Sequence, residues 1–271
     1  MLAPIDSVLS LLARRVCPLY VPNDRASRSP QLVGSSVLFR DDNHAYLVTA
    51  SHVLDGLGDR FLVAGDRGFL LIGGPRLAFG HLPGRSVDAD VGILRLDPAT
   101  VERLEPHYLW STRSDVGIIS DYNKFVLYAF LGYPFTKNQP VVKGITRVWT
   151  RAYFYLAREF EEISALGNEG KNSKVHFALA IPPKVRGLDG KSRRLPKPQG
   201  ISGGGVWKLT VDDSLGYVCG WELVGVAIER TKRPEAFVAT RFQLALGLLD
   251  RFTDPREEVP QGEAHPARQE V

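Results

Sequence analysis

Cysteine is scarce in this sequence, and the first residues do not resemble an export signal. The 271 residues include two cysteines, Cys17 and Cys219. Such a small number of cysteines fits a reducing compartment better than an oxidising one. The first twenty residues carry no basic segment ahead of their apolar stretch, which Asp6, Arg14 and Arg15 interrupt. A secretory signal peptide would keep that stretch apolar. We therefore expect a cytoplasmic protein.

Long apolar runs and cofactor motifs are absent as well. No run of about eighteen apolar residues occurs, so we predict no membrane-spanning segment. The sequence contains no His-Glu-x-x-His helix, no phosphate loop of the Walker type and no Cys-x-x-Cys pair. His44 and His52 lie on separate sides of a predicted strand, so they should not share a metal ion. We expect neither a metal nor a cofactor.

The composition is typical of a globular, mainly β protein. Hydrophobic residues make up 44% of the chain, which is enough to fill a core. The 26 glycines and 18 prolines lie between short apolar runs, a texture that indicates many strands joined by turns. The 34 basic and 30 acidic residues leave a net charge of +4, which is too mild to indicate nucleic acid or a membrane surface as a partner.

The apolar runs predict two groups of strands, separated by an irregular linker over residues 97–120. The first group covers residues 35–39, 45–49, 61–63, 69–72 and 91–96. The second group covers residues 125–131, 141–149, 175–181, 205–210, 217–228 and 237–240.

Helices are expected at the two ends of this region. Asp6 can cap a short N-terminal helix that Pro18 closes. The spacing of leucines predicts a closing helix over residues 242–252. Residues 253–271 have almost nothing to bury, so we expect a disordered tail there.

Three short segments carry the residue types of nucleophilic catalysis. Thr49-Ala50-Ser51-His52 follows a buried strand, Asp90 opens the strand Val91-Gly92-Ile93-Leu94, and Gly200-Ile201-Ser202-Gly203-Gly204 places a serine among glycines. A serine hydroxyl is a weak nucleophile at neutral pH, so it needs a base within hydrogen-bond reach, and the base needs an orienting partner. In the order His, Asp and Ser, the segments supply all three groups.

These segments resemble the motifs of the chymotrypsin/trypsin-like serine peptidase family, over most of residues 30–250. The resemblance implies an all-β fold of two six-stranded antiparallel barrels, the first over about 30–100 and the second over about 121–241, in one peptidase domain over 1–252. It also implies a serine endopeptidase that acts on protein or peptide substrates without a cofactor.

The resemblance assigns a role to each of four residues. Ser202 is implied as the nucleophile, His52 as the base that takes and returns its proton, and Asp90 as the acid that orients the base. The N–H groups of Gly200 and Ser202 are implied as the oxyanion hole, in a turn that a β-carbon at position 200 would obstruct. Asp88 is a rival to Asp90, although it lacks the apolar run in the right register.

The residues expected at the specificity pocket match the family poorly. The position six before the nucleophile is Pro196 rather than an acid, so we do not expect cleavage after Arg or Lys through the family's ion pair. Ile228 stands where the family often has a serine, and Glu229 and Arg230 follow it in the strand of the pocket wall. Phe237 would narrow the pocket and favour small residues, whereas Glu229 could instead recruit a basic side chain.

The loop over residues 182–200 is strongly basic, and no Ile-Val-Gly-Gly-like segment, the activation device of secreted relatives, occurs in the chain. Six cations and one acid give this loop a local charge of +5. Such a loop could steer an acidic substrate or order on binding a regulatory partner, and a solvated surface loop is the alternative. The six cations are Lys184, Arg186, Lys191, Arg193, Arg194 and Lys197.

Two functions of other classes stay open. The first is a catalytically inactive pseudo-protease that serves as a protein-binding module, for which the missing serine at Ile228 is the argument. The second is a nucleic-acid-binding protein that uses the basic loop. The loop has no interleaved aromatic residues on which bases could stack, so we do not expect a nucleic-acid partner.

Overall fold

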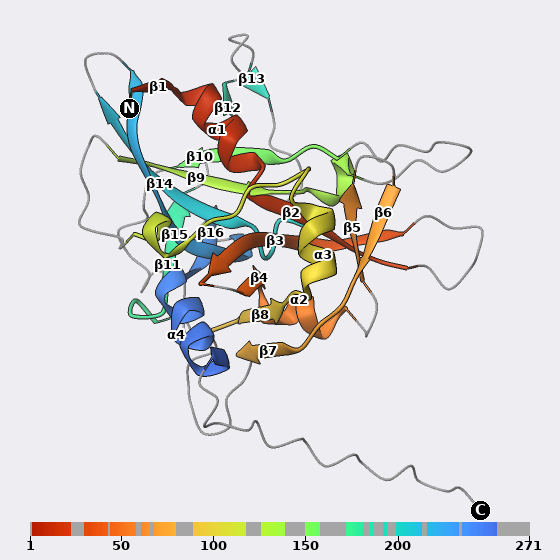
Figure 1. Ribbon diagram of the computed structural model, residues 1–271. Helices are drawn as coiled ribbons and strands as arrows, with labels where there is room; N and C mark the ends of the chain where they lie inside the picture. The colour runs from red at the N-terminus through yellow and green to blue at the C-terminus, as the bar shows by residue number, and fades with distance from the viewer. Residues whose placement is uncertain are drawn as a thin grey trace, which may run out of the picture.

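Two curled antiparallel β-sheets dominate the computed structural model (Figure 1). Most strands from the first part of the chain, drawn red to orange, form one sheet, and most of those drawn green to blue form the other. This arrangement is consistent with a chymotrypsin-like double barrel and confirms the predicted fold class, although each sheet has seven strands among the described residues where six were expected. The structure describes residues 2–22, 30–42, 44–57, 61–65, 68–79, 89–117, 126–138, 150–157, 172–180, 185–186, 192–193, 199–212, 216–232 and 235–253.

The first sheet has seven strands in the order β6-β5-β2-β3-β4-β8-β7, and all neighbours are antiparallel. Five of them match the first group of predicted strands, whereas β2 and β7 were not predicted. The sheet therefore begins well before residue 30. The strands are β2 (Val16–Val21), β3 (Gln31–Asp41), β4 (His44–Thr49), β5 (Phe61–Gly65), β6 (Gly68–Ile72), β7 (Arg76–Phe79) and β8 (Val91–Arg95).

The second sheet has six strands in the order β10-β9-β14-β15-β16-β11, and β1 adds a seventh by pairing with β15. The predicted strand over residues 141–149 lies outside the described residues. A separate pair is formed by β12 (Val185–Arg186) and β13 (Ser192–Arg193). The strands of the sheet are β1 (Ala3–Pro4), β9 (Val126–Gly132), β10 (Tyr153–Ala157), β11 (His176–Ala180), β14 (Gly205–Asp212), β15 (Tyr217–Lys232) and β16 (Glu235–Arg241).

One hydrophobic core is shared by the two sheets. It contains Phe39 and Tyr46 from the first sheet, Trp207 and Leu223 from the second, and Phe242 from the closing helix. The rings of Phe39 and Phe242 lie 5.3 Å apart, within the range of favourable aromatic contacts. Because burying apolar surface is the main stabilising term in folding, this core holds the two sheets against each other. Since this core fixes the strands, the loops that connect them begin and end at fixed positions.

The helices are α1 (Ile5–Ala13), α2 (Ser51–Asp55), α3 (Pro98–Leu104) and α4 (Phe242–Thr253) in the described part of the chain. The predicted closing helix is confirmed by α4. The predicted N-terminal helix is confirmed by α1, but Pro4 rather than Asp6 is its N-cap, and it ends at Ala13. Among the described residues, no helix has the length and apolar character needed to cross a bilayer.

The prediction that Pro18 closes the first helix is wrong, since Pro18 lies inside β2. Every residue of β2 from Val16 to Tyr20 is buried, so packing favours a strand at this position. β2 pairs with β5 only at Leu19 and Tyr20. Pro18 therefore lies where the sheet is open on one side, the kind of position in which a strand tolerates a proline.

The segment between the two sheets is more ordered than the predicted irregular linker. It contains α3, which Asp97 caps by accepting the Thr100 N–H at 2.8 Å, and a 3-10 turn, η1 (Arg113–Asp115). Ser111 exchanges backbone hydrogen bonds with β3, and the Gly117 N–H donates to the Leu223 carbonyl of β15 at 3.1 Å. The linker is thus attached to both sheets.

Candidate active site

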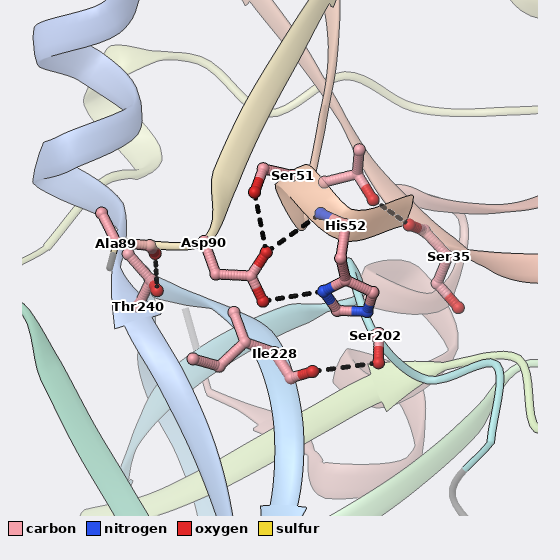
Figure 2. Close-up of polar contacts among 9 residues, drawn as sticks. Ser35, Ser51, His52, Ala89, Asp90, Ser202, Ile228 and Thr240 are labelled. Carbon is pink, nitrogen blue, oxygen red and sulfur yellow. Dashed lines mark hydrogen bonds and ion pairs between the residues drawn. The ribbon is translucent and has the colours of Figure 1, made fainter. Parts of the chain in front are cut away.

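Asp90 and His52 form a hydrogen-bonded pair at one end of the first sheet (Figure 2). His52 lies in α2, directly after β4, and Asp90 precedes β8, the neighbour of β4. The Asp90 Oδ2 atom lies 2.7 Å from His52 Nδ1. Asp90 Oδ1 accepts the backbone N–H of His52 at 3.1 Å and the Ser51 hydroxyl at 2.9 Å. The carboxylate therefore fixes both the ring and the backbone of His52.

Asp90 itself is held by the elements around it. Its φ is +42°, in the left-handed region that Asp enters more readily than most residues. The Thr240 hydroxyl of β16 donates to the carbonyl of Ala89, which anchors the chain just before Asp90 (Figure 2). A β-carbon on Gly92 would lie 2.5 Å from Leu54 Cδ1, so the glycine lets α2 pack closely against β8.

The contact between His52 and Asp90 shifts the pKa of each residue in the direction that favours its charged form. The hydrogen bond to Asp90 raises the pKa of His52 above its ordinary 6.5, although burial acts in the opposite direction, and the charge of Glu229 adds to the increase. Burial acts to raise the pKa of Asp90, but the hydrogen bonds from His52 and Ser51 and the charge of His52 lower it below 3.8. The His52 side chain is 52% exposed and that of Asp90 is 18% exposed. The imidazole is thus open to a ligand, while its partner is shielded.

Ser202 comes from the second half of the chain, in the turn that leads into β14. Its Oγ donates to the Ile228 carbonyl of β15 at 3.0 Å. Figure 2 shows the His52 ring between Asp90 and Ser202, and all three residues line one cavity. The hydroxyl proton is directed to Ile228, and no hydrogen bond joins Ser202 to His52 in the described part of the chain.

The turn around Ser202 has four consecutive carbonyl groups that each accept a hydrogen bond. The Gln199 carbonyl accepts the N–H of Phe135 in the turn η2 (Phe135–Lys137) at 2.6 Å, and the Ile201 carbonyl accepts the Gly204 N–H at 2.8 Å. The carbonyls of Gly200 and Ser202 both accept from Ser35, from its hydroxyl at 2.7 Å and from its N–H at 2.8 Å. Because a trans peptide is planar, fixing a carbonyl also fixes the N–H of the next residue on the opposite side.

These contacts leave two N–H groups of the turn available. Within the described residues, the N–H groups of Gly200 and Ser202 donate to no protein group, whereas the Gly203 N–H donates to the Ala227 carbonyl at 2.7 Å. Their directions are nevertheless set, since the carbonyls before them belong to Gln199 and Ile201, which are both bonded. A fixed, unpaired pair of N–H groups is suited to binding an anion.

Two glycines of this turn are required by its geometry. Gly200 has a φ of +92°, and a β-carbon there would lie 2.6 Å from the Tyr133 carbonyl oxygen. Gly203 has a φ of +85°, and its β-carbon would overlap Thr49 Oγ1 and the Ser35 carbonyl oxygen. Only glycine adopts this backbone without strain and leaves this space free.

The cavity beside Ser202 measures about 410 Å³ and brings four of the predicted pocket residues together. Phe237 is buried and packs against the rings of Phe130 and Tyr155, with centroids 4.8 and 5.3 Å away. The lining residues are His52, Asp90, Gln199, Ile201, Ser202, Ala227, Ile228, Glu229, Arg230 and Phe237. Taken over the described residues, no group of three or more His, Cys, Asp or Glu side chains could hold a metal ion.

Several predicted features lie outside the described residues. They are the rival acid Asp88, the pocket candidate Pro196 and, within the basic loop over residues 182–200, the side chains of residues 182–198. Only the backbone pairing of β12 with β13 is described within that loop.

Comparisons with known proteins find similar solved structures but no similar sequence. A solved structure similar to this chain is the crystal structure of the serine endoprotease from Yersinia pestis. The two are 17% identical, with a TM-score of 0.48, and the match covers 91% of this chain and 65% of that one. This chain therefore spans less than two thirds of that protein's length. No family model matches the chain, and no curated protein matches its sequence.

Two residues of the site were not predicted from the sequence. Ser51 donates to Asp90, and the signal that could have indicated this contact is its place directly before His52 in the sequence. Ser35 holds two carbonyls of the turn around Ser202, and the signal that could have indicated it is the pair of serines, Ser35 and Ser36, at the start of the predicted strand over residues 35–39. Their bonds join residues far apart in sequence, which no local pattern specifies.

Proposed function

We propose that this chain is a serine endopeptidase of the chymotrypsin/trypsin-like type, which hydrolyses peptide bonds in protein or peptide substrates. The observation that carries the proposal is the hydrogen-bonded pair of Asp90 and His52, which lines one cavity with Ser202. An acid, an imidazole and a hydroxyl in this relation can perform nucleophilic acyl transfer. The chain's own residues provide every group that this reaction needs.

In the proposed mechanism, Ser202 Oγ attacks the carbonyl carbon of the scissile peptide and its proton passes to His52 Nε2. Asp90 holds the ring in the tautomer that accepts this proton and stabilises the resulting imidazolium. His52 then gives the proton to the leaving amine nitrogen, and an acyl ester remains on Ser202. Water attacks the ester, with His52 again taking and returning a proton.

The first step requires a local movement of Ser202. Its hydroxyl donates to the Ile228 carbonyl at 3.0 Å, so it must turn toward His52 before it can transfer its proton. A serine side chain rotates between staggered positions, and catalytic hydrogen bonds often tighten only when substrate is bound.

The charge that develops on the substrate oxygen would be stabilised by the N–H groups of Gly200 and Ser202. Both are free of protein acceptors within the described residues and both follow a bonded carbonyl. Such donors need no reorganisation when the negative charge forms, which is the main advantage of a preorganised oxyanion hole.

The cavity beside Ser202 would receive the substrate side chain before the scissile bond. Ile201, Ala227 and Phe237 give it apolar walls, which favour a small apolar side chain. Glu229, exposed at the same cavity, would instead favour a basic one. Cleavage of peptides that differ only at this position separates the two alternatives.

The experiment that tests the proposal uses a fluorophosphonate probe, which labels only an activated serine. The expected result is labelling of the wild-type chain and none of the Ser202→Ala variant, with both proteins folded. Loss of the nucleophile should also lower peptide cleavage by about a million-fold. A wild-type chain that is folded but neither labelled nor active would overturn the proposal.

The second candidate function is a pseudo-protease that binds proteins without cleaving them. The orientation of the Ser202 hydroxyl toward Ile228 instead of His52 is the observation that favours it. The same labelling experiment decides between the two, because a pseudo-protease has no activated serine.

Regulation by a partner protein belongs to the proposal as well. The basic loop precedes Gly200 in the chain, so a partner that orders it would act next to the oxyanion turn. Replacing Lys191, Arg193 and Arg194 together by Ser should weaken cleavage of acidic substrates or activation by a partner, with a difference that shrinks as salt rises. A cytoplasmic location also stays a prediction, and the two free thiols are compatible with it.

A further inference from the structure

Ser35 is a fully buried serine of β3 that connects the first sheet to the turn around Ser202. It is 0% exposed, and its hydroxyl and N–H both bind that turn, although the hydroxyl bond to Gly200 spans 165 positions of sequence. A buried hydroxyl needs hydrogen-bond partners to offset its loss of water. Here the partners belong to the proposed oxyanion turn.

The direction of the Ser35 hydroxyl proton is fixed by its neighbours. The Tyr133 N–H donates to Ser35 Oγ at 2.9 Å and so fills an acceptor position. The single O–H can then donate to the Gly200 carbonyl, which lies 2.7 Å away. Thr49 Oγ1 donates to the Ser35 carbonyl at 2.7 Å, which holds the backbone of Ser35 in place.

The hydroxyl contact is the one that depends on the identity of residue 35. Any residue except proline would keep the bond from its N–H to the Ser202 carbonyl. The bond to the Gly200 carbonyl needs the serine Oγ. Gly200 is a glycine at a φ of +92°, so the peptide that follows it meets little steric resistance to rotation once this bond is lost.

We propose that Ser35 is a positioning residue: from the first sheet it holds the Gly200 carbonyl, and so fixes the peptide unit between residues 200 and 201. This unit lies between the N–H groups of Gly200 and Ser202, and its fixed orientation keeps both of them aimed at the developing oxyanion. This inference rests on the proposed peptidase function. Ser35 does not touch the substrate, and it acts through the peptide units of residues 200–202. The first sheet thus provides the base and its acid and also fixes the anion site.

The test compares Ser35→Ala with Ser36→Ala. Ser36 is the next residue, is also 0% exposed, and donates its hydroxyl to the Val48 carbonyl at 3.0 Å, away from the turn around Ser202. Ser36→Ala loses the bond to the Val48 carbonyl, whereas Ser35→Ala loses both the bond to the Gly200 carbonyl and the bond from the Tyr133 N–H. Ser35→Ala should therefore be the less stable variant, and both must be assayed well below their unfolding temperatures. They differ in whether the lost bond reaches the oxyanion turn.

Two rate measurements give the readout: the second-order rate of fluorophosphonate labelling, and kcat and KM on a peptide substrate as functions of pH. For Ser35→Ala we expect labelling and kcat to fall by about ten-fold or more, because misplaced donors stabilise the transition state less. KM should stay within about threefold of the wild-type value, since the lost stabilisation belongs to the transition state. The pH of half-maximal activity should not move, because His52 and Asp90 keep their contacts. Ser36→Ala should stay within about twofold of wild type in every constant.

Three results would overturn the inference: labelling of Ser35→Ala at the wild-type rate, an equal loss in Ser36→Ala, or a loss confined to KM. Circular dichroism and thermal unfolding verify that both variants are folded. If Ser35→Ala does not fold, Ser35→Cys replaces it, because the thiol fills the same space but is a weak donor, and the same comparison applies. A wild-type chain without labelling overturns both this inference and the proposed function, whereas unchanged labelling of the variant overturns this inference alone.

Discussion

Asp90 holds His52 at two points, through the ring Nδ1 at 2.7 Å and through the backbone N–H at 3.1 Å. Asp90→Asn keeps the shape of this side chain, but the amide removes the charge that stabilises the imidazolium. We expect peptidase activity to fall by about 10⁴-fold. Steady-state kinetics on a peptide substrate provides the measurement. Asp88→Asn is the matched control and should leave peptidase activity nearly unchanged. A large loss in Asp88→Asn with little loss in Asp90→Asn would assign the orienting role to Asp88.

The pH dependence of activity follows from the raised pKa of His52. The ring must be neutral to take the Ser202 proton, so activity should rise with pH through a midpoint above 6.5. Glu229→Gln removes a charge that raises this pKa, and the midpoint should therefore move to lower pH. The measurement is kcat/KM between about pH 5 and 9, where His titrates. A midpoint that moves upward in Glu229→Gln would contradict the assignment of His52 as the base.

Gly203 and Gly216 provide a matched pair for stability. Both have a positive φ, but a β-carbon would overlap Thr49 and Ser35 at Gly203 and would meet nothing within 4 Å at Gly216. We expect Gly203→Ala to lower the free energy of unfolding by about 3 kcal/mol, through strain and overpacking together. Gly216→Ala should cost about 1 kcal/mol, from backbone strain alone. Denaturant titrations of the two variants measure the difference, and equal losses would show that crowding at Gly203 is relieved by movement.

The two cysteines should behave as free thiols with very different reactivity. Cys17 is buried in β2, where burial raises the pKa of its thiol, whereas Cys219 is exposed in β15. Alkylation without reductant should give one adduct quickly in the native protein and two in denaturant, because the thiolate is the reactive form. Mass spectrometry counts the adducts. A protein that gains none in denaturant without reductant carries a disulfide, and would indicate an oxidising compartment.

The sequence predicted most strands because short apolar runs between turns have few other solutions in a mainly β chain. It does not indicate β2, because a proline commonly ends a helix, whereas here the burial of Val16 through Tyr20 favours a strand that includes Pro18. The motif around His52 and the apolar strand after Asp90 were sufficient to predict that these two residues lie together. The hydrogen bond of Ser35 to Gly200 could not be predicted in this way, since the two residues are 165 positions apart.

The pairing of β1 with β15 has a consequence for the order of folding. Ala3 lies opposite Val218, more than two hundred positions later, while β2 through β8 build the other sheet in between. During synthesis, β1 therefore has no partner strand until more than two hundred further residues have left the ribosome. Contacts of such long range slow folding, because the ends of a long loop must meet before the contact forms. We expect the first sheet to form early and the pairing of β1 to be among the last events.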